Sequence, residues 1–432
     1  MLFARDIEPA DVVIRGARVL DPVHGIDAVM DVRVDGGVIA QLGHDLPTNA
    51  HRVVEGEGKL LAPAFVDPHV HLRTPGREDE ETIATGTQSA AAGGYCAILA
   101  MPNTDPIVDS AAVLGSLIDG ARATADVAVG FLAAISKGQG GTELTEMGEL
   151  ADAGAAGFTD DGQPVTSAGL MRRALQYSAV ARRTVAVHCE EPALSRDGQM
   201  HEGDVSAQLG FAGYPSVAES VMVERDLALA AYERRPLHLL HLSARESVAA
   251  LRGAREAGIA ASGEVTPHHL VLTDEAVRSL DANLKMNPPL RAAEDRAALV
   301  DALLDGTIGA VATDHAPHAR HEKEVPWEAA PFGVTGLETA FPVLYTHLVA
   351  PGLVPLETLL ERMSAGPARI YGLDEPAIAV GATANLVLID PAAEWTVEER
   401  GFRSRSANSW LLGQTLRARI LLTVAAGRVA FG

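Results

Sequence analysis

Apolar runs of strand length recur through the middle of the chain, about residues 57–370, and most are followed by longer stretches rich in Ala, Leu, Arg and Glu. The stretches at 167–183 and 218–235 have helical character, whereas the short runs are typical of buried strands. Eight such strand–helix units predict a (β/α)8 TIM-type barrel, with a doubly wound open sheet as the alternative. The eight runs are LAPAFVDPHVH, YCAILAMPN, DVAVGFLAAI, GAAGFTDD, TVAVHCE, LHLLHLS, ASGEVTPHH and IGAVATDHAP.

Both ends of the chain show a different pattern, in which short alternating runs are broken by Gly and Pro. Residues 11–56 contain two such runs joined at Asp35-Gly36-Gly37, which predicts a hairpin. The C-terminal runs NLVLIDP, LRARILLTVAAG and GRVAFG are also strand-like. The two β-rich ends therefore predict one composite β-sandwich domain, made of residues 1–56 and 373–432, around a barrel of residues 57–372.

Composition narrows the class of protein. Apolar residues make up 47% of the 432 residues, aromatic residues only 4%, and the net charge is −22. An acidic surface argues against nucleic-acid and anionic-membrane binding. No apolar run reaches about eighteen residues, and the N-terminus lacks the apolar segment of a signal peptide. The two distant cysteines, Cys96 and Cys189, predict no disulfide, so we expect a cytoplasmic protein.

The first barrel strand ends in Asp67-Pro68-His69-Val70-His71. His69 and His71 are two residues apart on a strand, so they share a face and can converge on one metal ion. Alone this pair is a weak signal, since two surface or hydrogen-bonded histidines would give the same pattern.

Four later strands end in further metal-binding residue types. With His69 and His71 they give six nitrogen or oxygen ligand candidates, which a barrel gathers around one pocket at the carboxyl ends of its strands. Six ligands exceed the needs of one tetrahedral zinc and suit two ions bridged by a carboxylate; Zn²⁺ is favoured, with Mn²⁺, Co²⁺ or Fe²⁺ as alternatives. The later candidates lie in FTDDG (158–162), HCE (188–190), HLS (241–243) and TDH (313–315).

Such a centre predicts hydrolysis of an amide, or its reversal. Zinc lowers the pKa of bound water to about 7, so a metal-bridging hydroxide would attack the carbonyl carbon. Asp314, on the last strand, is the candidate acid and base that carries the proton to the leaving nitrogen. Cys189, beside His188, should point to the opposite face, and we interpret it as a core residue.

Other polar residues near these strand ends suit a small substrate with a carboxylate. They are Arg73, Asn103, Asn287 and His318. A guanidinium forms paired hydrogen bonds with a carboxylate. A solvent salt bridge remains the alternative for Arg73, and a turn before Pro-Pro remains the alternative for Asn287.

Together, these motifs resemble those of dihydroorotases of the amidohydrolase superfamily. DPHVHLR (67–73) and ATDHAPH (312–318) are similar to the two signature segments of that family. MPNT, FTDDG, HCE, HLS, EVTPHH and NPPLR are similar to segments of the bacterial class I enzymes, and the resemblance covers the whole chain. The combination is specific, whereas H-x-H alone is shared by the superfamily.

The resemblance implies a role for each residue. His69, His71 and Asp314 would bind the first of two zinc ions, His188 and His241 the second, and Asp161 would bridge them. Asp314 would also be the acid and base. Dihydroorotate would be held by Arg73, Asn103, Asn287, His318 and the backbone of Phe332 and Gly333, within a lid at about residues 318–335.

The implied reaction is the reversible cyclisation of N-carbamoyl-L-aspartate to L-dihydroorotate and water, the third step of pyrimidine synthesis. The resemblance also implies a homodimer and is compatible with association with aspartate transcarbamoylase. Hydantoinases, dihydropyrimidinases and allantoinases are rival functions, but they typically bridge their metals with a carboxylated lysine, and FTDDG has none. A non-catalytic partner of the transcarbamoylase is a further alternative, disfavoured because every ligand position is retained.

Overall fold

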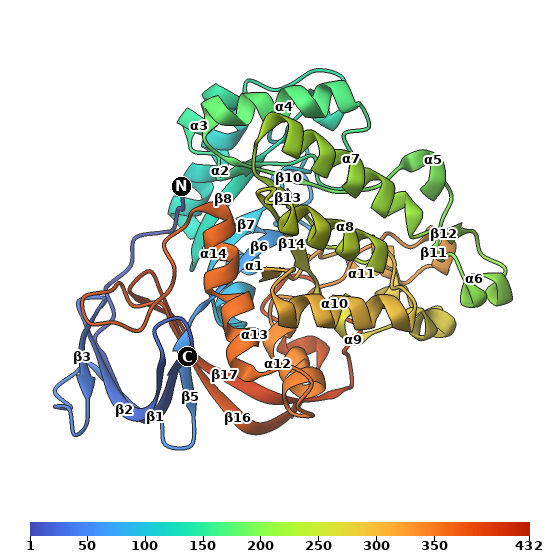
Figure 1. Cartoon of the computed structure of the whole chain (residues 1–432). Helices are drawn as coiled ribbons and strands as arrows, with labels where there is room; N and C mark the ends of the chain where they lie inside the picture. Colours follow the sequence, from blue (N-terminus) through green and yellow to red (C-terminus); the bar gives the residue numbers. More distant parts are fainter.

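Eight parallel strands form the centre of the computed structural model, which describes residues 1–432 (Figure 1). Each predicted apolar run supplies one strand of this sheet. The last strand returns to the first, because His71 N donates to His315 O over 2.9 Å and Val70 pairs with His315 in a parallel bridge. This closure confirms the predicted barrel and rules out the open sheet. In order around the barrel the strands are β6 (Phe65–Val70), β7 (Tyr95–Ala100), β8 (Ala128–Ala133), β9 (Gly157–Phe158), β10 (Thr184–Val187), β13 (Leu237–Leu239), β14 (Ala261–Val265) and β15 (Ala310–Val311).

Helices cover the outside of the barrel (Figure 1). The two stretches with helical composition form α4 and α7, and each ends at an arginine in the left-handed conformation, Arg182 and Arg234. The Ser167 side chain caps the start of α4 by accepting from Leu170 N. The longer helices are α1 (Ile83–Ala92), α2 (Ala111–Thr124), α3 (Met147–Ala153), α4 (Ala168–Ala181), α7 (Val217–Glu233), α8 (Arg245–Glu256), α10 (Ala293–Asp305), α13 (Leu356–Met363) and α14 (Ala365–Tyr371).

Shorter elements occupy the loops between these helices and strands. No helix of the structure has the length and apolar character that crossing a bilayer requires. The short elements are η1 (Lys137–Gln139), α5 (Pro192–Ser195), β11 (Met200–His201), α6 (Asp204–Leu209), β12 (Gly213–Tyr214), α9 (Pro267–Val271), η2 (Asp274–Ser279), η3 (Ala282–Leu284), α11 (Arg320–Lys323), η4 (Trp327–Ala329), α12 (Ala340–Leu344), η5 (Tyr345–Val349) and η6 (Glu399–Gly401).

Both ends of the chain contribute to a second, mostly antiparallel sheet, which appears in blue and red in Figure 1. The predicted hairpin joins β2 to β3 through Gly36 and Gly37, both with positive φ. β5 pairs with β16, so the two ends of the chain meet in one sheet. Its strands are β1 (Val12–Asp21), β2 (Ile26–Asp35), β3 (Val38–Gly43), β4 (Arg52–Glu55), β5 (Leu60–Pro63), β16 (Leu386–Thr396), β17 (Thr415–Ala425) and β18 (Arg428–Phe431).

This second sheet has a hydrophobic core of its own, to which both chain ends contribute, for example Val12 and Leu388. β5 lies in this sheet although it follows residue 56, and the first barrel strand starts at Phe65. The predicted domain boundaries at residues 56 and 372 stay predictions. Between η6 and β17, residues 403–409 return to the barrel and make contacts described below.

Candidate metal centre

The end of β6 is fixed to the end of β15 by a buried carboxylate. Asp67 Oδ1 accepts from His69 N and from Thr313 N, each over 3.1 Å, and Asp67 Oδ2 accepts from Thr313 Oγ1 over 2.5 Å. These bonds join the first and last strands. They therefore set the positions of His69, two residues after Asp67, and of Asp314, which directly follows Thr313.

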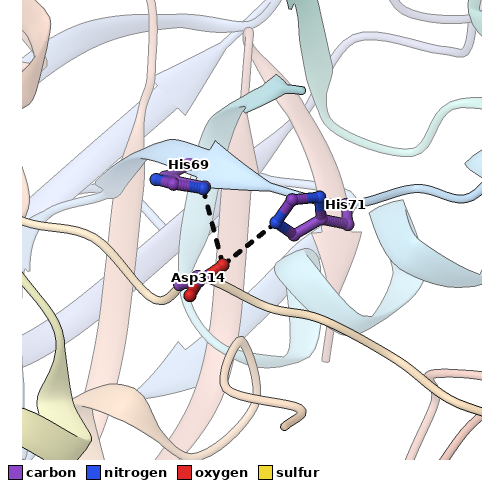
Figure 2. A group of neighbouring side chains, drawn as sticks. All are labelled: His69, His71 and Asp314. Carbon is purple, nitrogen blue, oxygen red and sulfur yellow. Dashed lines mark hydrogen bonds and ion pairs between the residues drawn. The ribbon is translucent and has the colours of Figure 1, made fainter. Parts of the chain in front are cut away.

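Three of the predicted ligands converge across this seam. Asp314 Oδ1 lies 3.0 Å from His71 Nε2 and 3.4 Å from His69 Nε2, as Figure 2 shows. These three ligand atoms lie within 4.8 Å of one another, and all three residues are less than a tenth exposed. The group has the size of a site for one metal ion.

Asp161 connects this group to the other two histidines. Its Oδ2 lies 3.4 Å from His69 Nε2 and 3.6 Å from His71 Nε2. Its Oδ1 lies 3.4 Å from His241 Nε2 and 3.9 Å from His188 Nδ1. Each carboxylate oxygen therefore faces a different pair of imidazoles, which is the arrangement expected of a carboxylate between two ions.

The donor atoms fit divalent metal ions. His69 Nε2 and Asp161 Oδ1 are buried and have no hydrogen-bond partner in the protein, which is costly for polar atoms unless another group binds them. The set contains imidazole nitrogen and carboxylate oxygen without thiolate, as zinc and related ions accept. Cys189 lies in the hydrophobic core as expected, and burial raises the pKa of its thiol.

Outer partners fix which nitrogen of His69 and of His188 faces the centre. His69 Nδ1 donates to Glu264 Oε1 over 2.8 Å, and His188 Nε2 donates to Glu190 Oε2 over 2.9 Å. Burial alone would raise the pKa of these carboxyls, but their histidine partners lower it to about 2 in each case. Both glutamates therefore stay ionised and hold the opposite ring nitrogens toward the centre.

Asp314 is also held ionised. Burial opposes its charge, but the neighbouring imidazoles of His69 and His71 keep the pKa of this carboxyl well below its usual range. Asp314 has a positive φ of 48°, so its backbone is in a conformation that few L-residues adopt. An ionised carboxylate at this position can accept a proton from an attacking water.

A cavity of about 190 Å³ opens over five of the six predicted ligands, His71, Asp161, His188, His241 and Asp314. All the predicted site residues line it except His69, which is completely buried. Two residues that we did not predict, Gly162 and Ala316, complete its wall. The remaining lining residues are Arg73, Asn103, Asn287, His318, Phe332 and Gly333.

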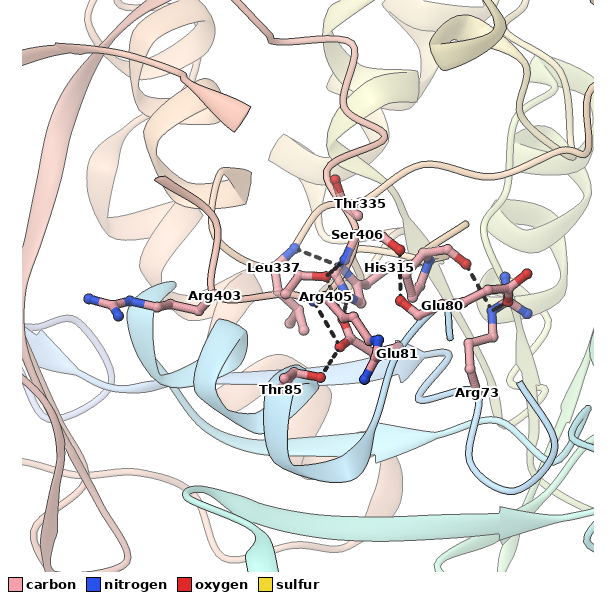
Figure 3. Close-up of polar contacts among 12 residues, drawn as sticks. Arg73, Glu80, Glu81, Thr85, His315, Thr335, Leu337, Arg403, Arg405 and Ser406 are labelled. Atoms are coloured by element: carbon pink, nitrogen blue, oxygen red, sulfur yellow. Dashed lines mark hydrogen bonds and ion pairs between the residues drawn. The ribbon is translucent and has the colours of Figure 1, made fainter. Parts of the chain in front are cut away.

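Arg73 is held by one edge of its guanidinium. Its Nε donates to Pro317 O over 3.1 Å and lies 3.0 Å from Glu80 Oε2, a contact drawn in Figure 3. Its Nη2 lies 3.5 Å from His318 Nε2. Arg73 therefore has an internal carboxylate partner rather than a solvent salt bridge.

The two asparagines each keep part of the amide free. Asn103 Oδ1 accepts from His71 Nδ1 over 2.9 Å, which leaves its NH₂ group for a ligand. Asn287 Nδ2 donates to Glu190 Oε2 over 3.2 Å, whereas its Oδ1 is buried without a partner. The cavity thus offers both a donor and an acceptor in addition to the Arg73 guanidinium.

Phe332 and Gly333 have backbone partners of their own. Phe332 O accepts from His318 Nε2 over 2.8 Å, and Gly333 N donates to Lys285 O over 2.8 Å. Gly333 has a φ of 121°, and a Cβ there would lie 2.7 Å from Ala316 Cβ. Glycine is therefore required for this part of the loop to line the cavity.

Several residues that support the site were not singled out from the sequence. Glu190 lies two residues after the assigned ligand His188, and Glu264 opens the strand-end motif EVTPHH, so these motifs were the available signal. Glu80, Glu81 and Asn408 lie outside all strand ends, and no spacing along the chain points to them.

The fold and this centre define the class, an amidohydrolase-type barrel with a candidate metal site. Residues 58–247 match a family model described as dihydro-orotase-like. The dihydroorotase of Geobacter sp. (strain M21) is 44% identical over 98% of this chain and 99% of that protein. The dihydroorotase of Pelotomaculum thermopropionicum is 45% identical over 96% of this chain and 97% of that protein. The chain belongs to the dihydroorotase family.

Among solved structures, similarity extends to related hydrolases. The L-hydantoinase (dihydropyrimidinase) from Arthrobacter aurescens has a TM-score of 0.87 and 26% identity, covering 97% of this chain and 96% of that chain. A dihydropyrimidinase from Brevibacillus agri NCHU1002 has a TM-score of 0.81 at 23% identity, covering 98% of this chain and 95% of that one. The latter likeness concerns the fold alone.

Proposed function

We propose that the chain is a zinc-dependent dihydroorotase, which interconverts N-carbamoyl-L-aspartate and L-dihydroorotate plus water. Two relatives that match this chain over nearly its whole length, at 44% and 45% identity, are dihydroorotases. The observation that carries the chemistry is Asp161, whose two oxygens face two separate pairs of histidines. A centre of this form suits hydrolysis of a cyclic amide and its reversal.

The proposed ligands form two groups that share Asp161. His69, His71 and Asp314 belong to one group, and His188 and His241 to the other. Zinc, when bound, supplies a Lewis acid for the amide carbonyl and makes water a nucleophile near neutral pH. The protein positions the ligands through Glu190 and Glu264.

Asp314 carries the proton in this proposal. In the hydrolytic direction its carboxylate takes a proton from the attacking water and delivers it to the ring nitrogen as the carbon–nitrogen bond breaks. In the cyclising direction it accepts a proton from the attacking carbamoyl nitrogen and returns it to the departing oxygen of the substrate carboxyl, and a second proton taken up from solvent completes the water that leaves.

The substrate carboxylate is assigned to Arg73, Asn103 and His318. The Arg73 guanidinium, which the protein binds at Nε, and the Asn103 NH₂ can both donate to it. Asn287 Oδ1, which lacks a partner, is the acceptor for a ring N–H. Phe332 and Gly333 then form the wall beside the ring, within the expected lid.

Hydantoinases, dihydropyrimidinases and allantoinases remain the rival substrate specificities, and the solved hydantoinase-type structures share the fold. Two features favour dihydroorotate. Arg73 lines the cavity, and its guanidinium is bound at Nε by Pro317 O and Glu80. The proposed bridging position holds Asp161 rather than a lysine, but other dihydroorotases use a carboxylated lysine, so this second feature points to a subgroup and does not by itself separate the functions. A carboxylate on the substrate would explain why a guanidinium, that of Arg73, lines the cavity.

The test is a side-by-side assay of the purified protein with dihydroorotate, hydantoin, dihydrouracil and allantoin, with bound zinc quantified. We expect turnover of dihydroorotate well above the others and about two zinc ions per chain. A protein that binds no zinc and gains no activity when zinc is added would refute the enzyme proposal and favour a structural partner. Preference for a neutral ring would favour a rival specificity.

A homodimer, association with aspartate transcarbamoylase and a cytoplasmic location complete the proposal. Light scattering of the purified chain tests the first. Co-sedimentation with the transcarbamoylase tests the second, and cell fractionation tests the third.

A further inference from the structure

The segment 403–409 crosses from the second sheet to the barrel mouth. Four of its residues are buried although it has no regular secondary structure: Ser404, Ser406, Asn408 and Ser409. Arg405 N donates to Glu81 Oε1 over 3.1 Å, and Ser404 Oγ also donates to Glu81. Figure 3 shows Arg405 and Ser406 close to Glu81 and His315. His315, which follows β15, also contacts Glu81. The segment 403–409 and the loop after β15 are therefore joined through the Glu81 carboxylate.

Asn408 makes the closest connection between this segment and the proposed substrate site. Its Oδ1 accepts from His318 N over 3.0 Å. Its Nδ2 donates to Ala316 O over 3.1 Å and to Gly333 O over 3.2 Å. Its backbone oxygen accepts from Thr335 N over 3.0 Å. Asn408 thus binds residues on both sides of the loop 316–335.

The partners of Asn408 form the wall of the cavity. Ala316, His318 and Gly333 all line it. The two sides of the loop are otherwise joined there by few bonds, among them Ala316 N to Val334 O and His318 Nε2 to Phe332 O, each over 2.8 Å. The Asn408 amide therefore helps to set the distance between His318 and Gly333, since it binds the backbone of both.

We propose that Asn408 is a positioning residue for substrate binding, through which the second sheet completes the active site of the barrel. The inference rests on the proposed function, since it assigns His318 and Gly333 to the substrate. It goes beyond that function, because the roles assigned above involve only residues of the barrel and its loops.

The side-chain amide of Asn408 matches the donors and acceptors of the backbone groups around it. One acceptor faces an N–H group, and two donor hydrogens face two carbonyl oxygens, so both kinds of polar atom are used. A carboxylate in the same position would put negative charge against the oxygens of Ala316 and Gly333. An alanine would leave three buried backbone groups without partners.

Loss of these bonds should affect substrate binding more than the metal centre. None of the groups bonded to Asn408 belongs to a metal ligand, whereas His318 and Gly333 are assigned to the substrate. Displacement of a binding group by about 1 Å can cost up to about a hundredfold in efficiency. We expect a rise in KM rather than a loss of metal.

The experiment compares Asn408→Ala, Asn408→Asp and Asn408→Ser with the unaltered zinc-loaded chain, using dihydroorotate as substrate. Asn385→Ala is the matched control, since Asn385 directly precedes β16 of the second sheet and its side chain accepts only from Ala426 N. The measurements are kcat, KM, bound metal and Tm. We expect KM to rise about tenfold for Ala and further for Asp, with kcat within about threefold and metal content unchanged. Ser should fall between Ala and the unaltered chain.

Two results would overturn the inference. One is a KM within about twofold of the unaltered chain for both Asn408→Ala and Asn408→Ser. The other is an equal rise in KM for Asn385→Ala. If Asn408→Asp does not fold, the Ala and Ser variants decide the matter. An unaltered chain that binds zinc and does not turn over dihydroorotate would instead refute the proposed function.

Discussion

His69 and Glu264 are 195 residues apart in sequence, yet His69 Nδ1 donates to Glu264 Oε1 over 2.8 Å in the centre of the barrel. The other oxygen of Glu264 accepts from His238 Nε2 over 2.9 Å. One fully buried carboxylate therefore holds two imidazoles and directs His69 Nε2 toward Asp161 and Asp314.

Replacement of Glu264 should weaken metal binding. In Glu264→Gln, the amide NH₂ replaces one acceptor oxygen, so His69 or His238 loses its bond. Loss of such an outer partner typically lowers metal affinity about 10- to 100-fold. Competition with a chelator measures the effect, and Glu246→Gln on the exposed face of α8 is the control. Equal affinities in the two variants would contradict this role.

Replacement of Asp314 should remove most activity and leave the fold intact. Asp314→Asn keeps the shape of the side chain but cannot accept a proton, and general acid–base catalysis is worth about 10²- to 10⁴-fold in rate. Asp314 is also a proposed ligand, so bound metal is measured together with kcat. A metal-loaded variant within about tenfold of the unaltered turnover would show that another group carries the proton.

Replacement of Arg73 should chiefly weaken binding of the substrate carboxylate. Arg73→Ala removes a charge-assisted donor, and KM should rise about 10- to 100-fold in both directions of the reaction. The matched control is Arg77→Ala, because Arg77 also contacts Glu80 but does not line the cavity. Unchanged kinetics with dihydroorotate and with carbamoyl aspartate would refute the assignment.

The sequence predicted the barrel because each strand is a short apolar run that ends in polar residues. It also predicted an aspartate ligand within FTDDG, which follows a strand directly, whereas the choice of Asp161 came from the family resemblance. It could not reveal that Asp160, its neighbour, points away and accepts from Ile135 N and Ser136 N. The choice between adjacent aspartates depends on backbone direction after a two-residue strand, which the pattern does not specify.

The contacts that support the site from distant parts of the chain could not be predicted from the sequence. Asn408 is 90 residues from His318, and Glu81 is 234 residues from His315. Contacts of this kind depend on how the second sheet packs on the barrel. Periodicity describes each element separately and carries no information about that packing.

Lys323, in the expected lid, has an unusual environment. It is 8% exposed, and its Nζ donates to Ala282 O over 3.0 Å and to Pro331 O over 2.7 Å. Burial lowers the pKa of Lys323 to about 7, and nearby Lys285 acts in the same direction. The folded protein therefore loses this proton at a lower pH than the unfolded chain, in which the pKa of lysine is about 10.4.

Stability should consequently depend on pH through Lys323. Between about pH 7 and pH 10 the unfolded chain holds the proton and the folded chain does not, so the free energy of unfolding rises with pH. We expect the Tm of the unaltered chain, relative to that of Lys323→Met, to increase from about pH 6.5 to pH 9.5. Lys137→Met, at an exposed lysine paired with Glu143, should show no such increase. A Tm difference for Lys323→Met that stays constant over this range would mean that the lysine keeps an ordinary pKa in the folded protein.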